Sequence, residues 1–215
     1  MRTQITHHPD PSTLVSYAAG TLAEPLAAVV ASHIALCSRC RDEVHHLDVV
    51  GGVLMMSSGS APGPVAAMPV PGEPPQHAVP ATVAGAHERL PSPIAAAYGL
   101  SFDRIPWRRL GPGVWHYRLA LSDGVQGDLR LLKISAGRAM PDHGHGGGEL
   151  TLVLDGAYAD QTGEYRAGDI QDVDESIEHT PMADPNMGCI CLIAGEQPAR
   201  FKGWIGKLLQ PFTGM

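Results

Sequence analysis

A histidine and two cysteines near the N-terminus have the spacing of a metal site. His33, Cys37 and Cys40 form a His-x-x-x-Cys-x-x-Cys element, which holds two of the chain's 4 cysteines. Residues four apart share a helix face, and a cysteine three residues further can return to the same point from the next helix. Imidazole nitrogen and thiolate sulfur suit tetrahedral Zn²⁺. The spacing favours three zinc ligands over two buried cysteines beside a chance histidine, and His7 or His8 can supply the fourth.

A second group of candidate ligands lies in the C-terminal half of the chain. His143 and His145 are two residues apart, so on a strand they point to one side. Glu149 follows three glycines, whose freedom allows a bulge or turn that returns the carboxylate to that side. His179 arrives from a later predicted strand. Three imidazoles and a carboxylate suit Zn²⁺, and equally Mn²⁺, Fe²⁺ or Ni²⁺.

Two further features have a structural and a functional interpretation. Cys189 and Cys191 lie on one face of an apolar strand, which favours a place in the core. They also form a candidate redox pair, although reactivity requires exposure and a lowered pKa. Glu178 is adjacent to His179 and is either a group that orients this histidine or a solvent-exposed loop carboxylate.

The elements that must position the first group are helices. Residues 1–56 contain a predicted N-cap at Asp10 and a capping box from Thr21 to Glu24. The helix after the capping box carries apolar residues and His33 at helical spacing. A third helix is predicted from about Arg39. Three short helices make a small core, which a bound metal would help to hold.

The chain divides into three segments by composition. After the helical segment, residues 57–93 contain nine of the 19 prolines and are interpreted as a linker. Residues 94–215 show short apolar segments separated by turn residues, which indicates an antiparallel barrel or jelly roll. The expected fold is a small all-α zinc-stabilised bundle followed by an all-β barrel.

Composition excludes several function classes. A formal net charge of −7 argues against direct binding of nucleic acid, which needs a basic surface to neutralise phosphates. The N-terminus lacks an apolar signal-peptide core, and no apolar run is long enough to span a membrane. We therefore expect a soluble, cytoplasmic protein.

The second group of ligands lies within a motif that resembles the first cupin motif. Residues 137–156 match Gly-x5-His-x-His-x3-Glu-x6-Gly at every fixed position. The second cupin motif is matched only at Gly168 and His179, because Asp174, Ser176 and Ala183 stand where it has Pro, Gly and Asn. The resemblance implies a cupin barrel with a metal held by the four predicted ligands. A cupin fold alone leaves the function open.

A His-x-x-x-Cys-x-x-Cys helical segment tethered to a cupin resembles the ChrR-type zinc-binding anti-sigma factors. The resemblance covers essentially the whole chain, including Ala-Ala-Gly-Thr-Leu at 18–22 and the Cys189-x-Cys191 pair. It implies that His8, rather than His7, completes the zinc site. It further implies a regulator that sequesters an extracytoplasmic-function sigma factor and releases it on oxidative stress, notably singlet oxygen, which the cupin senses.

An enzyme is the competing interpretation. A cupin with three histidines and a glutamate can bind Fe²⁺ or Mn²⁺ and carry out dioxygenase or isomerase chemistry. The helical segment would then be an accessory element. The linked zinc module favours the regulator, and we expect no catalytic activity.

Overall fold

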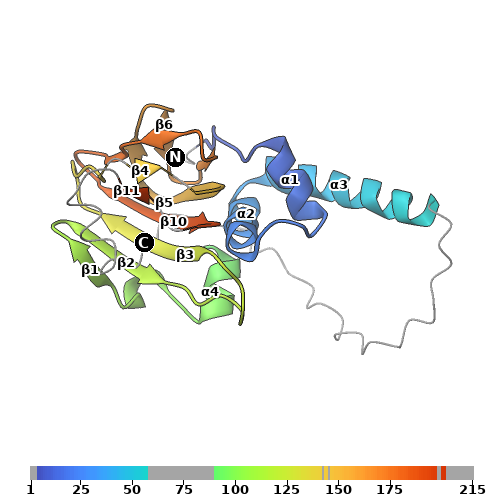
Figure 1. Cartoon of the computed structure of the whole chain (residues 1–215), viewed down its shortest axis with the longest axis horizontal. Helices are drawn as coiled ribbons and strands as arrows, with labels where there is room; N and C mark the ends of the chain where they lie inside the picture. Colours follow the sequence, from blue (N-terminus) through green and yellow to red (C-terminus); the bar gives the residue numbers. More distant parts are fainter. Residues whose placement is uncertain (1–3, 58–89, 142, 145, 198–199, 202–215) are drawn as a thin grey trace.

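The computed structural model describes residues 4–57, 90–141, 143–144, 146–197 and 200–201, so most of the predicted linker and residues 202–215 lie outside the described parts (Figure 1). The helices are α1 (Pro11–Ala18), α2 (Glu24–Leu36), α3 (Ser38–Ser57) and α4 (Ser92–Tyr98), followed by a 3-10 turn, η1 (Phe102–Arg104). No helix among the described residues is both long and apolar enough to cross a membrane.

The strands follow α4 and pair in antiparallel fashion among the described residues. They are β1 (Arg108–Gly111), β2 (Val114–Arg118), β3 (Asp128–Ile134), β4 (His143–Gly144), β5 (Glu149–Ala159), β6 (Glu164–Arg166), β7 (Ile170–Val173), β8 (Glu178–His179), β9 (Met182–Ala183), β10 (Cys189–Gly195) and β11 (Arg200–Phe201). The expected combination of an all-α N-terminal part and an all-β cupin barrel is confirmed.

Two sheets form the barrel. The larger has eight strands in the order β1-β2-β3-β10-β5-β6, with β7 and β9 also pairing with β5, and the smaller has the order β11-β4-β8. The longest strand, β5, continues past Gly156, which has a φ of 72°. A Cβ at this glycine would lie 2.1 Å from the carbonyl oxygen of Gly188, so β10 approaches β5 as closely as it does only because Gly156 has no side chain.

The helix starts test two sequence predictions. Asp10 caps α1 as expected, because its carboxylate accepts a hydrogen bond from the backbone N–H of Ser12. The capping box from Thr21 to Glu24 is wrong, because α2 begins at Glu24 without a side-chain cap. The Glu24 carboxylate instead accepts the backbone N–H of Ser122 at 2.9 Å, and this contact joins α2 to the loop before β3. A contact with a distant loop has thus replaced the predicted contact between Glu24 and the backbone of Thr21.

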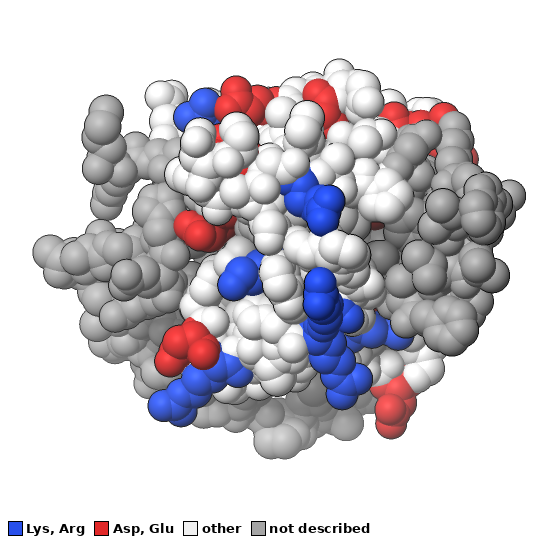
Figure 2. Space-filling view, turned by 90° about the vertical axis from the view of Figure 1, so that its left-hand side faces the viewer, with Lys and Arg blue, Asp and Glu red and all other residues white. Residues whose placement is uncertain are grey.

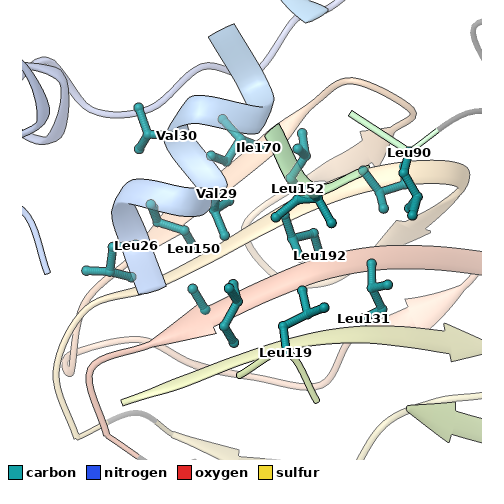
Figure 3. Packing of buried hydrophobic residues seen from close by; sticks show 14 of the residues in the cluster. Leu26, Val29, Val30, Leu90, Leu119, Leu131, Leu150, Leu152, Ile170 and Leu192 are labelled. Carbon is teal, nitrogen blue, oxygen red and sulfur yellow. The ribbon is translucent and has the colours of Figure 1, made fainter. Parts of the chain in front are cut away.

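The apolar face of α2 packs on the outer face of the large sheet. Leu26, Val29 and Val30 of α2 are buried and belong to one hydrophobic cluster with residues of β3, β5 and β10. Figure 3 shows Val29 on the side of α2 that faces Leu150 and Leu152 of the sheet. The helical part and the barrel therefore share a core rather than having two separate ones. Burial of this kind is the main stabilising term between them.

The second half of α3 is different, because it extends away from the other helices and the barrel (Figure 1). Val44 is buried near its start and Leu47 is half-buried, whereas the apolar residues from Val49 on are exposed. Six of the ten exposed large apolar side chains among the described residues lie here: Val49, Val50, Val53, Leu54, Met55 and Met56. The apolar surface of this part of the helix is therefore largely uncovered.

A second hydrophobic cluster fills the barrel interior. It includes Val153 of β5 and Cys191 of β10, which lie opposite each other in the strand register. Figure 2 shows the end of the molecule at the left of Figure 1, where Lys and Arg are interspersed with Asp and Glu. The described residues on this face therefore form no continuous basic surface of the kind that nucleic acids require.

Candidate metal centres

Four side chains from the helical part converge on one point. His8 precedes α1, His33 lies in the last turn of α2, Cys37 follows that helix, and Cys40 lies in the first turn of α3. One ligand atom from each lies within 4.8 Å of all the others. The short break between α2 and α3 produces this convergence, because Cys37 leaves the helix with extended backbone angles. Among the described residues, this is the group of His, Cys, Asp or Glu that could hold a metal ion.

The distances between these donors fit the edges of a zinc tetrahedron. His33 Nε2 lies 3.3 Å from Cys40 Sγ, and His8 Nδ1 lies 3.2 Å from Cys40 Sγ and 3.6 Å from Cys37 Sγ. Typical Zn–N and Zn–S bond lengths at a tetrahedral angle place N and S about 3.6 Å apart. Two imidazoles and two thiols are also the donor set of structural zinc sites. The four residues therefore fit Zn²⁺ in both chemistry and size.

Burial favours the neutral forms of His8, His33 and Cys40. It lowers the pKa of His33 to about 4, with a smaller contribution from the nearby His8, so His33 is neutral near pH 7. Burial and then the neighbouring Arg39 lower the pKa of His8. Burial, followed by the adjacent Cys37, raises the pKa of the Cys40 thiol to about 12. A thiolate at this position thus requires a cation in contact with it, which Zn²⁺ would provide.

The structure separates the two histidines between which the sequence could not decide. His8 lies in the cluster. His7 instead stacks against Tyr165 with ring centroids 4.6 Å apart, and its Nδ1 lies 3.5 Å from a carboxylate oxygen of Asp169. Adjacent residues thus point to different neighbours, and a pattern of two consecutive histidines carries no information on which one turns inward.

The four residues predicted to hold a metal in the barrel are only partly described. The backbone of His143 on β4 pairs with that of His179 on β8. Glu149 begins β5, and its side chain lines a cavity together with that of His179. His145 lies outside the described residues, and for His143 the structure describes the backbone alone. The described positions are compatible with a site at this cavity, and the full ligand set stays a prediction.

The cavity has a volume of about 70 Å³ and is lined mainly by residues of β3, β5, β7 and β10 of the large sheet, together with His179 of β8. Polar residues on its wall include Arg130, Thr151 and Gln171, and Arg130 and Gln171 are each 2% exposed. Cys191 also lies on its wall. A small molecule or ion could therefore contact both the carboxylate of Glu149 and the ring of His179 in a largely enclosed space.

A network that the sequence did not reveal holds His179. Its Nδ1 donates a hydrogen bond to the Asp160 carboxylate at 2.7 Å, and both side chains are almost fully buried. Burial alone would raise the pKa of Asp160, but hydrogen bonds from His179, Thr162 and Gln171 outweigh it and hold the pKa well below its usual value. A carboxylate bonded to the far nitrogen of an imidazole is the usual partner of a metal-binding histidine.

Nothing in the sequence near His179 indicates that Asp160 is its hydrogen-bond partner. Glu178, the adjacent carboxylate, is exposed, whereas Asp160 is 19 residues away in sequence. Asp160 also accepts the backbone N–H of Thr162, which is the ordinary behaviour of an aspartate in a turn. The local pattern therefore explains Asp160 without its second contact, and only the pairing of distant strands shows it.

Cys189 and Cys191 lie in the barrel core, each 2% exposed, with their sulfur atoms 3.1 Å apart. The hydrogen bond to Cys189 and burial raise the pKa of Cys191 well above its usual value. A neutral, buried thiol packs as a small apolar group and reacts slowly as a nucleophile. Their position supports the packing interpretation, and their closeness leaves the redox pair as a prediction.

Comparisons of the sequence and of the structure with known proteins point to the same family. Residues 96–198 match a family model described as the ChrR cupin-like domain. The chain is 43% identical to the anti-sigma-E factor ChrR of Cereibacter sphaeroides, over 97% of this chain and 98% of that protein. It is also similar to a solved structure of Rhodobacter sphaeroides SigE in complex with the anti-sigma ChrR, with 38% identity and a TM-score of 0.71 over 89% of this chain and 99% of that one.

Proposed function

The chain belongs to the family of ChrR anti-sigma factors, and on this premise we propose that it is a zinc-dependent anti-sigma factor that sequesters an extracytoplasmic-function sigma factor. The observation that carries the proposal is a relationship that extends over nearly the full length of both chains. Membership in a family of regulators also decides against the metal-dependent enzyme that the sequence left open. Sigma factors act on RNA polymerase, so a cytoplasmic location is part of the proposal.

The helical donor cluster would hold the zinc. Zn²⁺ bound by His8, His33, Cys37 and Cys40 would supply folding free energy, because a site absent from the unfolded chain couples metal binding to folding. The four residues connect the segment before α1 with the end of α2 and the start of α3. Their common contact would fix the direction in which α3 leaves the bundle.

The exposed half of α3 supports a role in holding the sigma factor. Its six exposed apolar side chains begin about two turns after Cys40, so the zinc cluster sets the base from which they project. Exposed apolar helix surfaces of this kind are typical of helices that lie in a groove of a partner protein. The apolar face of α2 is already covered by the sheet, so the described helices offer α3 as the larger uncovered apolar surface.

Sigma capture by surface variants tests this role. We expect the double variant Val53→Glu/Leu54→Glu to bind about 30-fold more weakly or worse to an extracytoplasmic-function sigma factor that the wild type captures, the loss of an interface hot spot, with zinc content unchanged. Met187→Glu is the matched control, because Met187 is 67% exposed but lies on the barrel. Equal capture by the double variant and the wild type would refute a role for α3.

We further propose that the barrel senses oxidative stress, notably singlet oxygen, and that this releases the sigma factor. In this proposal His143, His145, Glu149 and His179 bind a divalent metal, either Zn²⁺ or Mn²⁺, Fe²⁺ or Ni²⁺. The cavity beside Glu149 and His179 supports it, because a metal there would be accessible only to small reactants. The thiols of Cys189 and Cys191 are the second candidate target.

Release from the full-length complex tests the sensor. The His179→Ala and Cys189→Ser variants, each loaded with sigma factor, are illuminated with a photosensitiser that produces singlet oxygen. We expect His179→Ala to hold the sigma factor as the wild type does in the dark and to retain it in the light. Release of sigma factor from this variant at the wild-type rate would contradict the sensor, and the Cys189→Ser variant separates a thiol target from a metal target.

A further inference from the structure

Three consecutive residues of the barrel, Gly168, Asp169 and the first residue of β7, Ile170, contact either the donor cluster or the segment that leads to it. The first contact is a hydrogen bond from His33 Nδ1 to the backbone carbonyl oxygen of Gly168, at 3.1 Å. A carbonyl only accepts, so Nδ1 carries the proton and Nε2 has its lone pair free to face the cluster. Nε2 is the atom that lies 3.3 Å from Cys40 Sγ. A barrel residue thus selects the ring form of His33 that can bind a metal.

The second contact fixes the backbone that leads to His8. The carboxylate of Asp169, a residue 2% exposed, accepts the backbone N–H of Thr6 at 2.7 Å and that of His7 at 3.0 Å. The backbone N–H of Ile170 donates to the carbonyl oxygen of His7 at 3.3 Å. Two residues of the barrel therefore hold the dipeptide that immediately precedes a cluster histidine.

Close packing reinforces these hydrogen bonds. Gly168 has a φ of 96°, a conformation that favours glycine. A Cβ at this position would lie 2.7 Å from Cγ1 of Ile5. The turn and the N-terminal segment are thus in direct contact, with no room for a side chain between them.

The same strand leads to the barrel cavity. Gln171 lies two residues after Asp169, and its Nε2 donates to the Asp160 carboxylate at 2.8 Å while its Oε1 accepts the Tyr158 hydroxyl at 2.8 Å. Asp160 in turn accepts Nδ1 of His179. A continuous series of hydrogen bonds and two peptide units therefore joins His179 to the segment before His8.

We propose that Gly168 and Asp169 are positioning residues of the zinc cluster, and that His179, Asp160 and Gln171 connect this cluster to the barrel cavity. The inference rests on the proposed function in one respect, the binding of zinc by the four cluster residues. It goes beyond that function because it makes the barrel part of the zinc site. A change at the cavity would then alter how tightly the zinc is held, without a direct contact between the two sites.

Zinc retention by the full-length protein tests the positioning role. Loss of a group that orients a metal ligand lowers metal affinity by about 10- to 100-fold, and we expect this loss in Asp169→Asn, measured by competition with a chromogenic chelator. Asp172→Asn is the matched control, because Asp172 lies on β7, three residues after Asp169, and its carboxylate accepts hydrogen bonds from Asp10 and Thr13, neither of which is adjacent to a cluster ligand. We expect its zinc affinity to stay within about threefold of the wild type.

Two additional measurements distinguish positioning from simple loss of stability. The thiolate-to-cobalt absorption bands of the Co²⁺-substituted protein report ligand geometry, and we expect them to shift in Asp169→Asn but not in Asp172→Asn. If Asp169→Asn does not fold, Gly168→Ala replaces it, since it displaces Ile5 without changing a charge. Unchanged affinity and spectra in these variants, or an equal loss in Asp172→Asn, would overturn the positioning role.

The connection to the cavity has its own test. Asp160→Ala removes the acceptor shared by His179 and Gln171, and residues along such a path change coupling by amounts equivalent to about 2- to 30-fold. We expect zinc to leave the cluster faster by a factor in this range, measured against Cys37→Ala, which lacks the site. An unchanged release rate would overturn the connection. Absence of cluster zinc from the wild type would instead refute the proposed function.

Discussion

The donor cluster of the helices and the cavity of the barrel both contain buried histidines, but different groups hold them in place. In the cluster, His8, Cys37 and Cys40 contact mainly one another, and His33 has one bond to the barrel. In the cavity, His179 is bonded to a carboxylate that accepts four further hydrogen bonds, from Thr162, Gly163 and Gln171. The cluster thus brings together donors that only a cation can satisfy, whereas the cavity network is satisfied by protein groups.

This difference indicates separate roles for the two regions. A region that is held by a metal ion folds or loosens with that ion, so it suits a surface that must be formed or lost. A barrel with its own hydrogen-bonded interior keeps its shape when a ligand or oxidant changes one group within it. The contacts at the start of β7 would join the two regions, since they connect the cavity network to the cluster.

Metal removal should produce the largest difference in stability between the two regions. After exhaustive chelation we expect amide exchange in α3 and in residues 6–10 to accelerate by about 100-fold or more, because structural zinc contributes several kcal/mol of folding free energy. The core strands β3, β5 and β10 should exchange at nearly unchanged rates. Hydrogen exchange measured by mass spectrometry checks this, and addition of Zn²⁺ should restore protection. Equal acceleration in the barrel strands would show that the two regions do not differ in this way.

Adjacent residues of β5 separate the shared core from the barrel core. Leu152 packs with α2 and Val153 faces the barrel interior, and both are fully buried. We expect Leu152→Ala to lower the free energy of unfolding by about 2–5 kcal/mol, the usual cost of such a cavity. It should also increase exchange in α2, whereas Val153→Ala should leave α2 unaffected. Urea unfolding and hydrogen exchange provide the two readouts.

If Val153→Ala loosened α2 as much as Leu152→Ala did, the two clusters would behave as one core.

The smallest predicted effect concerns pH. The pKa of Asp160 is held below its usual value in the folded protein, so its stabilising contribution is present above about pH 4 and is lost as the pH falls below that. Between pH 5 and pH 3 this group alone should reduce the free energy of unfolding by about 1 kcal/mol. The stability difference between wild type and Asp160→Asn should therefore shrink by that amount over this range. A difference independent of pH would show that the carboxylate is not held in its charged form.

The donor cluster was largely predictable because most of it is local. His33, Cys37 and Cys40 lie within eight residues, and the helix period together with the break at Cys37 brings them together. His8 required the fold or a family resemblance, since nothing local distinguishes it from His7. The barrel was predictable from its strand periodicity and turn residues, although β4, β8 and β9 have two residues each and show no period.

The missed features all depend on contacts between distant segments. Asp169 bonds to residues more than 160 positions away, so it has no local signal. Glu24 belonged to a good capping-box pattern, but the loop at Ser122 offered a competing donor. The apolar stripe of α2 was visible, whereas its partner, the outer face of the large sheet, was not. Sequence patterns indicate which residues are buried, and the fold decides what buries them.

The central claim is that the zinc cluster forms the surface that captures the sigma factor. Zinc content and sigma capture are measured on the same samples of the full-length wild type, Cys37→Ala and Cys189→Ala, each co-expressed with the sigma factor. We predict that Cys37→Ala loses both the cluster zinc and the sigma factor, while Cys189→Ala keeps both. Sigma factor that still co-purifies with zinc-free Cys37→Ala would contradict the account.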